Sequence, residues 1–510
     1  MSQVASISSN RTALRIATEA SLGVLAGSPI FETFEPNSYS DFGGEITTTP
    51  RKPIKSDRMD RKGPVTDLDA KAGFNADLTQ NSLTQLLPGF FYAAFRRKVE
   101  KTSGIASVTA SSKTYTVDAD GDDFLAGDLV LASNFTNTGN NGLKSVASST
   151  GTTVVVNETC TDEGSPPSTA KLITVGFQFD SGDLVITQGA SQFPVLSTST
   201  KDLTELGLVP GEAIWIGGDS TATKFATAAC NGYARVRSIA ANAIVLDKTE
   251  GTIVTDSGTG KTIQIFLGRV IKNETGTDIV RTTYQLERTL GAPDDSLPAV
   301  EQTEYVVGGI CSELAINFAS ADKVTVDLSF MGLDHEPLSA GSQKSATRPA
   351  LTAEDAFNTS SNVKRFKFSQ TSSTVSNVTA LYSHISNFTL SLNNNITINK
   401  AIATLGGFDA SEGNFMVDFE GEPYFGNVSA IQAVRNNDDL TFDVLVALNN
   451  AGISIDVPLL AGGGALANVE ADAPIKLQLS SSGANGIDVH SSLNHVMLLT
   501  QFDYLPTAAM

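Results

Sequence analysis

The four histidines are the side chains best suited to acid–base or metal chemistry near neutral pH. His335 stands between Asp334 and Glu336, a grouping that could hold a metal ion or form an acid–base pair. No HExxH motif and no second histidine accompanies it, so a turn is the favoured interpretation. His490 and His495 are separated by an odd spacing, which on a strand puts them on opposite faces and prevents shared metal ligation. The histidines therefore predict no metal centre.

Glycine and cysteine motifs make no better case for catalysis. The run Gly462–Gly464 lacks the Lys-Ser/Thr that completes a phosphate-binding loop, and Gly258–Lys261 lacks the full spacing. No GxSxG nucleophile elbow is present. Cys160, Cys230 and Cys311 form no CxxC pair, which excludes a zinc ribbon and indicates small buried thiols. We therefore expect a protein that is not an enzyme and that needs no cofactor.

Composition narrows the class of protein and its partners. Lys and Arg number 35 against 55 Asp and Glu, and the net charge of -20 has the wrong sign for gripping nucleic-acid phosphates. Only 18% of residues are charged, and the abundance of Ser, Thr, Asn and Gly predicts many short strands joined by polar turns. A length of 510 residues predicts about three or four domains. The N-terminus lacks the organisation of an export signal and no apolar run approaches the ~20 residues of a spanning helix, so we expect a soluble subunit without a membrane partner.

One segment near the N-terminus is basic against the acidic background. Its cations are interrupted by two aspartates and flanked by Pro53 and Pro64, which predicts an extended loop. Two interpretations stay open: a solvated loop, or an arm that clasps an acidic neighbouring copy of the chain. The basic residues of this clasp loop are Arg51, Lys52, Lys55, Arg58, Arg61 and Lys62.

The elements that must position these residues are mainly strands. In residues 82–95 the apolar side chains recur at spacings of three and four, which predicts a short helix that Pro88 and Gly89 interrupt. Between about 100 and 265 two segments repeat each other, because Asn141-Gly142 and Asn231-Gly232 introduce similar apolar runs. Asn-Gly favours a tight hairpin in both copies. This region is predicted to be two small tandem β modules.

A second repeat relates the regions before and after residue 345. In residues 312–334, alternating apolar and polar residues are followed by a turn, a second alternating stretch and a Gly-apolar-Asp sequence. Residues 387–409 show a similar pattern. A weaker echo relates Gly73–Leu78 to Gly413–Phe419. The predicted organisation is an N-terminal arm at 1–30, a discontinuous first domain at 31–98 and 266–340, β module A at 100–175, β module B at 176–265, a Ser/Thr/Pro-rich linker around 338–352, and a second copy of the first domain at 346–510.

Several of these segments together resemble a known family. Three segments are similar to major tail-tube proteins of siphophages, of a type with two tube domains and inserted β modules: the stretch from Glu35 to Ala93, the strand pair that ends in Ser-Phe-Met-Gly-Leu-Asp334, and the stretch Thr200–Asp219. The resemblance covers most of the chain. It implies a mainly β fold: duplicated tail-tube β-sandwich or barrel domains with a flanking short helix, plus the two inserted modules.

The resemblance also implies a function. Such domains join edge to edge so that strands of successive copies form an inner β-barrel, and the rings stack into a tube through which DNA is ejected. A chain with two tube domains would give a pseudo-sixfold ring from three copies, with a homohexamer as the alternative. The implied partners are other copies of the chain, the tape measure protein, DNA in the lumen, and the tail terminator and tail tip proteins. The implied location is the virion tail, with assembly in the host cytoplasm.

Acidic residues that alternate with apolar neighbours are candidates for the lumen face, where they would repel phosphates. An outer solvated face is the alternative for the same residues. Two other functions also stay open, a receptor- or carbohydrate-binding virion protein or adhesin and another structural part such as a terminator or capsid decoration protein. The candidate lumen acids are Asp327, Asp418, Glu420 and Asp443.

Overall fold

The computed structural model describes residues 7–188, 193–291, 301–338, 343–372, 374–382, 384–484 and 493–510. The chain is mainly β, as its polar, strand-forming composition predicts, and the described residues contain two short α-helices. Large antiparallel sheets account for most of the fold.

A first set of strands forms a two-layered unit, here called the first unit. The long strand β21 belongs to both layers, because one half of it continues β1–β20 and the other half continues β4–β5–β22. Apolar side chains between these layers and from α1 form the core. The elements are β1 (Ala13–Ser21), β4 (Pro36–Thr48), β5 (Val65–Asp77), α1 (Leu87–Phe91), β20 (Tyr284–Gly291), β21 (Gln302–Ala319) and β22 (Thr325–Gly332).

A second set of strands, the second unit, repeats this order of pairing. Strand β24 pairs with β29 and β29 with the first half of β30, while β25, β28, β31 and the second half of β30 form the other layer. Each unit has a helix after the corresponding strand: α1 follows β5, and α2 follows β28. The elements are β24 (Val363–Gln370), β25 (Ile385–Asn393), β28 (Met416–Pro423), α2 (Ser429–Arg435), β29 (Asp439–Leu448), β30 (Ala451–Asn468) and β31 (Lys476–Ala484).

Irregularities in the strand ladders confirm that the two units correspond. Between β20 and β21 the register shifts from Tyr284↔Gly309 to Leu286↔Val306. Between β29 and β30 it shifts in the same way, from Leu440↔Leu460 to Phe442↔Val457. A β-bulge of this kind is a specific local feature and not a chance irregularity. Counterpart residues in the two units can therefore be assigned from the ladders.

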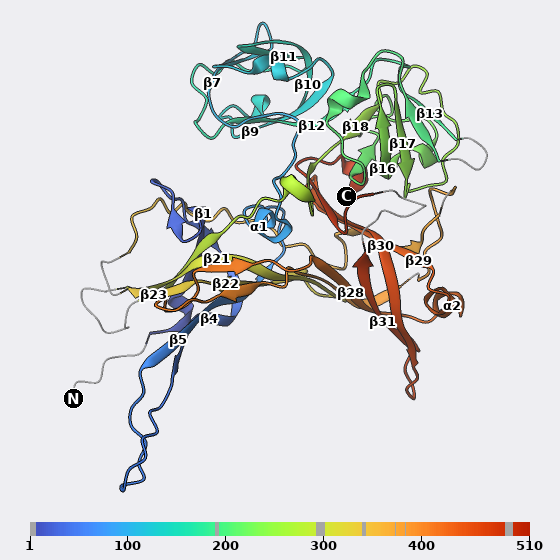
Figure 1. Cartoon of the computed structure of the whole chain (residues 1–510). Helices are drawn as coiled ribbons and strands as arrows, with labels where there is room; N and C mark the ends of the chain where they lie inside the picture. The colour runs from blue at the N-terminus through green and yellow to red at the C-terminus, as the bar shows by residue number, and fades with distance from the viewer. Residues whose placement is uncertain are drawn as a thin grey trace.

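The pairing of β21 with β25 joins the two units into one layer. Strand β21 of the first unit pairs with β25 of the second from Glu313↔Asn393 to Ala319↔Asn387. Phe318 and Phe388 stack across this junction with ring centroids 4.2 Å apart, and one hydrophobic core runs through both units. The result is one layer with the strand order β4–β5–β22–β21–β25–β28–β31–β30. In Figure 1 this layer spans the lower half of the molecule, between the β4–β5 hairpin at one end and the β30–β31 hairpin at the other.

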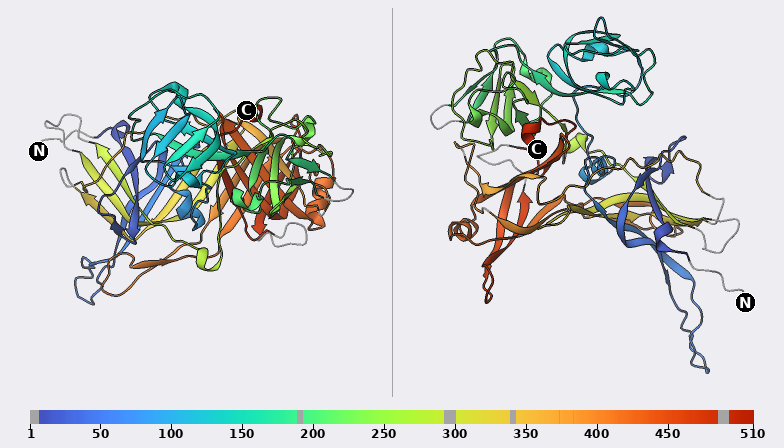
Figure 2. Two further views of the ribbon diagram at one scale, coloured as in Figure 1. Left: turned by 90° about the horizontal axis from the view of Figure 1, so that it is seen from above. Right: turned by 180° about the vertical axis from the view of Figure 1, so that it is seen from behind.

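Residues between α1 and β20 form two compact β modules on the far side of that layer (Figure 2). One hydrophobic cluster contains residues between Val108 and Leu172, and another contains residues between Phe177 and Leu267. Strand β12 passes from one to the other. Their strands are β6 (Glu100–Lys101), β7 (Ile105–Thr109), β8 (Thr114–Val117), β9 (Asp128–Ser133), β10 (Gly142–Thr150), β11 (Thr153–Val156), β12 (Lys171–Gln178), β13 (Val185–Thr187), β14 (Val195–Ser197), β15 (Ala213–Ile216), β16 (Gly232–Ala240), β17 (Ala243–Asp247) and β18 (Gln264–Phe266).

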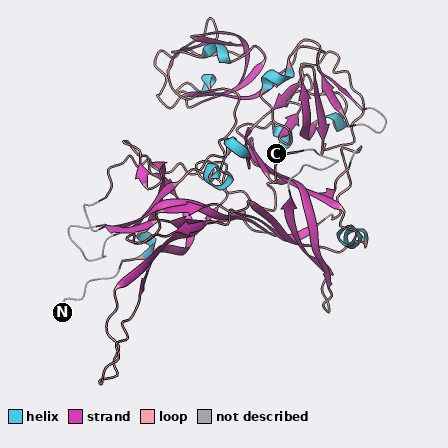
Figure 3. Ribbon diagram, viewed as in Figure 1, coloured by secondary structure: helices cyan, strands magenta, loops and turns pink. Residues whose placement is uncertain are grey.

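Shorter strands complete the sheets, as Figure 3 shows in magenta. β32 pairs with both β19 and β30, and β23 pairs with β21. These strands are β2 (Val24–Leu25), β3 (Glu32–Phe34), β19 (Arg269–Lys272), β23 (Asp334–Leu338), β26 (Thr397–Asn399), β27 (Asp409–Ser411) and β32 (Leu498–Phe502).

The structure corrects three details of the sequence interpretation. Residues 13–21, expected in an N-terminal arm, form β1 and pair with β20. The helix expected within 82–95 shortens to α1, because Tyr92 adopts a left-handed conformation and ends it. The repeat predicted between residues 312–334 and 387–409 matches segments that are not counterparts, because residues 387–392 lie in β25, the counterpart of β4, and residues 397–399 pair with β27 in a small hairpin; the counterparts of β21 and β22 are β30 and β31.

Candidate assembly surface

One face of the eight-stranded layer is a continuous polar surface, here called the polar face. Strand alternation places every second residue on it. One row of paired residues consists of Asn75, Asp327, Ala315, Ser391, Asp418 and Ser482. The next row consists of Asp77, Thr325, Asn317, Thr389, Glu420 and Ser480.

The opposite face of the same strands is buried. Leu328 and Leu314 pair with each other and are each 1% exposed, and Leu392 and Val417 continue that row across the junction. This apolar face lies against α1, which in Figure 1 is on the same side of the layer as the two modules. The polar face therefore points away from the modules.

Three of the four candidate lumen acids share this face. Asp327 accepts hydrogen bonds from Asn75 and Asn317, each at 2.7 Å, and Asp418 accepts one from Ser482 at 2.6 Å. Glu420 is exposed one row away.

Glu313, which the sequence interpretation did not single out, also lies on the polar face and accepts a hydrogen bond from Asn393. The sequence signal for Glu313 was its place beside the apolar Leu314 in a run of alternating polar and apolar residues. Among the residues that the structure describes, none of these four carboxylates makes an ion pair, and Lys71, Lys323 and Lys476 lie at the margins of the face. The centre of the polar face is therefore acidic.

The prediction that Asp443 faces a lumen is wrong, because its side chain is buried at 1% exposure inside the molecule. It forms ion pairs with Arg365 and, at 3.4 Å, with Lys248 of module B. Burial by itself would raise the pKa of Asp443, but Arg365 and then Lys248 outweigh it and hold that pKa below its ordinary value. Asp443 is a structural residue.

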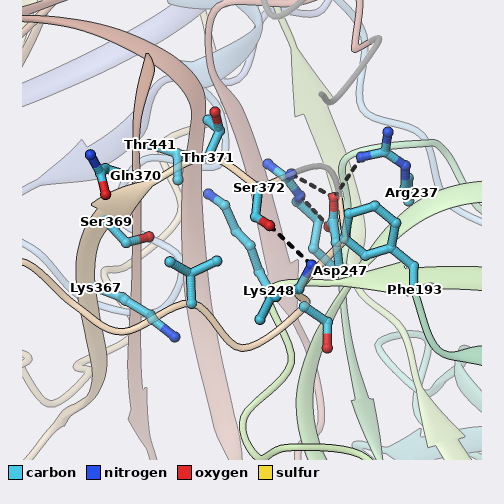
Figure 4. A pocket seen from close by; sticks show the side chains of 14 residues that line it. Phe193, Arg237, Asp247, Lys248, Lys367, Ser369, Gln370, Thr371, Ser372 and Thr441 are labelled. Carbon is cyan, nitrogen blue, oxygen red and sulfur yellow. Dashed lines mark hydrogen bonds and ion pairs between the residues drawn. The ribbon is translucent and has the colours of Figure 1, made fainter. Parts of the chain in front are cut away.

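Asp443 belongs to a buried charge cluster that joins module B to the second unit. Arg235 forms a bidentate pair with Asp247 at 2.7 and 2.8 Å and reaches Asp456 of β30 at 3.0 Å. Lys248 also pairs with Asp456. Figure 4 shows Lys248 and Asp247 from module B facing the second unit. The adjoining cavity of about 30 Å³ has room for roughly one water molecule, so it offers no ligand site.

The clasp loop forms the distal part of the β4–β5 hairpin, which projects far from the body of the molecule in Figure 1. Arg51 and Arg61 pair through two backbone hydrogen bonds of 3.1 and 2.9 Å, so the cations of the loop are gathered on one narrow arm. The loop is mostly exposed, and Ile54 at its tip is completely so. An exposed basic arm on an acidic chain is available for contact with another copy.

The layer ends in two open edges. Among the described residues β4 pairs only with β5, and residues 462–468 of β30 pair only with β31. Val469 is the counterpart of Phe318 in the ladders, yet Val469 is 70% exposed whereas Phe318 is 4% exposed because β25 covers it. An uncovered strand edge with an exposed apolar side chain is a template for pairing with another chain.

The histidines do not form a catalytic or metal site in the described part of the chain. His335 contacts Glu304 at 2.9 Å, and Glu304 is also bound by Arg288. Burial lowers the pKa of His495 to about 3, so it is neutral near pH 7, and His490 lies outside the described residues. Across the described ranges no group of three or more His, Cys, Asp and Glu could hold a metal ion, and no helix there is long and apolar enough to cross a membrane.

Glu212 of module B is a buried carboxyl whose proton affinity the fold alters strongly. Burial raises its pKa to about 8, against the opposing effect of the Val209 N–H, which donates to it at 2.8 Å. The folded chain therefore keeps a proton that the unfolded chain releases above pH 4.5, and the free energy of unfolding falls as pH rises from about 4.5 to about 8. We expect Glu212→Gln to flatten this decline in thermal-unfolding midpoints across that range. Parallel curves for the two proteins would contradict the assignment.

The two-layered β units, the polar face and the open edges are features of a structural protein. The chain belongs to the phage tail tube protein family, whose model matches residues 9–483. No curated protein matches the chain. As a member of this family the protein is a structural component of the bacteriophage virion tail.

Proposed function

We propose that the chain is the subunit of the tail tube, in which copies join edge to edge into closed rings and the rings stack into the conduit for DNA ejection. The observation that carries this proposal is the β21–β25 junction. It joins two equivalent units into one sheet within a single chain. The same junction repeated between chains, with β30 in place of β21 and β4 in place of β25, removes both open edges.

Three copies then suffice for a ring of six units. The two units are two tube domains, the first built from β1, residues 31–98 and residues 266–340, and the second from residues 346–510. Modules A and B are insertions in the first domain and decorate the outer wall, since they lie on the side of the layer opposite the polar face (Figure 1).

The ladders supply the register of the junction between chains. Asn317 faces Thr389 within the chain, and their counterparts at the open edges are Asn468 and Ser40. Phe318 faces Phe388, and their counterparts are Val469 and Tyr39. The half-buried Tyr39 is thus placed to cover Val469 of the neighbouring copy.

A double cysteine variant tests the ring. In Asn468→Cys/Ser40→Cys we expect disulfides between chains that convert the assembled protein into a covalent trimer on denaturing gels, with hollow rings or tubes in negative-stain micrographs. The matched control Asn468→Cys/Ser111→Cys places its second thiol on the exposed surface of module A, away from the edge, and should not cross-link in this way. A protein that stays monomeric at high concentration, or a covalent hexamer, would contradict the three-copy ring.

The polar face lines the lumen in this arrangement. Asp327, Asp418 and Glu420 present negative charge there, and like charges on the wall and on DNA keep the nucleic acid from adhering. Small hydroxyl and amide side chains between the acids leave a smooth wetted surface. The tape measure protein fills the same lumen before ejection, and the terminator and tip proteins bind the two ends of the tube after assembly in the host cytoplasm.

The clasp loop contributes to stacking between rings. We expect Arg58→Ala/Arg61→Ala to leave the thermal-unfolding midpoint of the unassembled chain unchanged, because both side chains are exposed, and to shorten tubes or shift the equilibrium toward single rings. Tube length by electron microscopy and sedimentation at low salt measure the effect. The control Lys113→Ala removes a partly exposed cation of module A. Unchanged tube length in the double variant would contradict a role of the clasp loop in stacking.

A further inference from the structure

The chain segment that leads into β24 is built into the first unit. Phe357 is 1% exposed, its N–H donates to the Leu78 carbonyl at 2.9 Å, and its carbonyl accepts from the Val324 N–H at 2.8 Å. The segment thus covers the seam, the place where the end of β5 meets the start of β22. This seam lies in the first unit, whereas the segment leads into the second unit.

Further contacts fix this segment on both sides of Phe357. Glu354 accepts hydrogen bonds from Thr79 and from the side chain and backbone of Asn81. Thr359 donates its N–H to the Asp322 carbonyl at 2.9 Å. Val324 is 0% exposed beneath the segment.

The second unit has the same seam, and there it is open. Phe425 donates its N–H to the Ile475 carbonyl at 3.0 Å, as Leu78 does to Val324 at 2.9 Å. No described part of the chain crosses this seam, and Ile475 is 37% exposed where its counterpart Val324 is fully buried. Val428 and Val469 beside it are 58% and 70% exposed.

We propose that this open seam, at Phe425 and Ile475, binds the segment that leads into β1 of the next copy in the ring. The proposal rests on the proposed ring, because ring closure brings the first unit of one copy beside the second unit of another. Strand β1 is the counterpart of β24, since both pair with the strand that precedes the long shared strand. Ile7 precedes Ala13, the first residue of β1, by the same six positions that separate Phe357 from Val363, the first residue of β24.

Ile7 is the apolar side chain that takes the place of Phe357 in the seam. In the single chain it is only partly buried. Its transfer to the seam adds two backbone hydrogen bonds to Phe425 and Ile475 and covers the exposed apolar side chains, so each ring interface acquires a strap in addition to the β30–β4 ladder.

Cross-linking and charge substitution test the strap. In Ile7→Cys/Ile475→Cys we expect disulfides between chains in assembled protein and none in unassembled protein. Ile7→Asp and Ile475→Asp should each keep the unfolding midpoint of the single chain and lower the yield of closed rings at least tenfold. Val24→Asp, at a side chain that is 56% exposed and remote from the seam, is the matched control.

The outcomes separate the strap from the ring itself. Rings that form and cross-link through Asn468→Cys/Ser40→Cys, but assemble equally well with Ile7→Asp and give no Ile7–Ile475 disulfide, would overturn the strap and leave the tube intact. Failure of the unaltered chain to form rings would instead overturn the proposed function together with the strap.

Discussion

Val469→Asp is expected to abolish ring closure while leaving the single chain folded. Val469 is 70% exposed in the chain, so a carboxylate there is solvated and costs the monomer little. In the proposed ring the same position corresponds to Phe318, which is 4% exposed and stacks on Phe388 at 4.2 Å. A charge buried at that contact without a partner costs several kcal/mol at every interface, and a closed ring contains several such interfaces.

Sedimentation and negative-stain microscopy measure this effect, with circular dichroism as the check on folding. Val254→Asp is the control, because Val254 is 50% exposed on module B and away from both edges. Tubes of normal yield from Val469→Asp would show that the β30 edge is not the ring interface.

Removing Arg365 is expected to be the most damaging single change to the stability of the chain. Its guanidinium pairs with Asp443, donates to the Lys248 carbonyl at 3.1 Å and lies 4.3 Å from the ring centroid of Tyr233. Arg365→Met leaves Asp443 buried with one remaining cation at 3.4 Å. Breaking a buried pair in this way costs about 3–5 kcal/mol.

The double variant Arg365→Met/Asp443→Leu distinguishes charge from packing. It removes both members of the pair, so it should unfold at a higher temperature than Arg365→Met alone. Arg237→Met is a milder control, because that side chain is partly exposed and its pair with Asp247 is longer, at 3.5 Å. Calorimetry would contradict the assignment if the double variant were less stable than the single one.

Alternation along the strands was sufficient to find the polar face. Asp327 and Asp418 each stand between apolar neighbours that enter the core, Glu420 follows the buried Phe419, and one buried layer is enough to produce that pattern. Asp443 has the same local pattern but lies in β29, which is buried along nearly its whole length. Module B covers its second face, and a partner such as Lys248, far away in sequence, leaves no local signal.

Alternation in the sequence suggested a duplication, but it matched segments that are not counterparts in the structure. The bulges at Tyr284 and Leu440 keep their place in the two ladders although the side chains differ, because backbone hydrogen bonding and not residue identity fixes a bulge. Sequence comparison therefore selected Ile396–Ile398, an apolar alternation of suitable length that folds into a small hairpin. The true counterpart of β22 lies much farther along the chain.

The two modules interrupt only one of the two equivalent units, after α1 and never after α2. In a three-copy ring the bore therefore repeats six times around the axis, whereas the coat of modules repeats three times. DNA that passes through the lumen contacts six similar units in each ring. The outer surface of such a ring carries three pairs of modules with gaps between them. The lumen surface and the outer surface can therefore change independently during evolution.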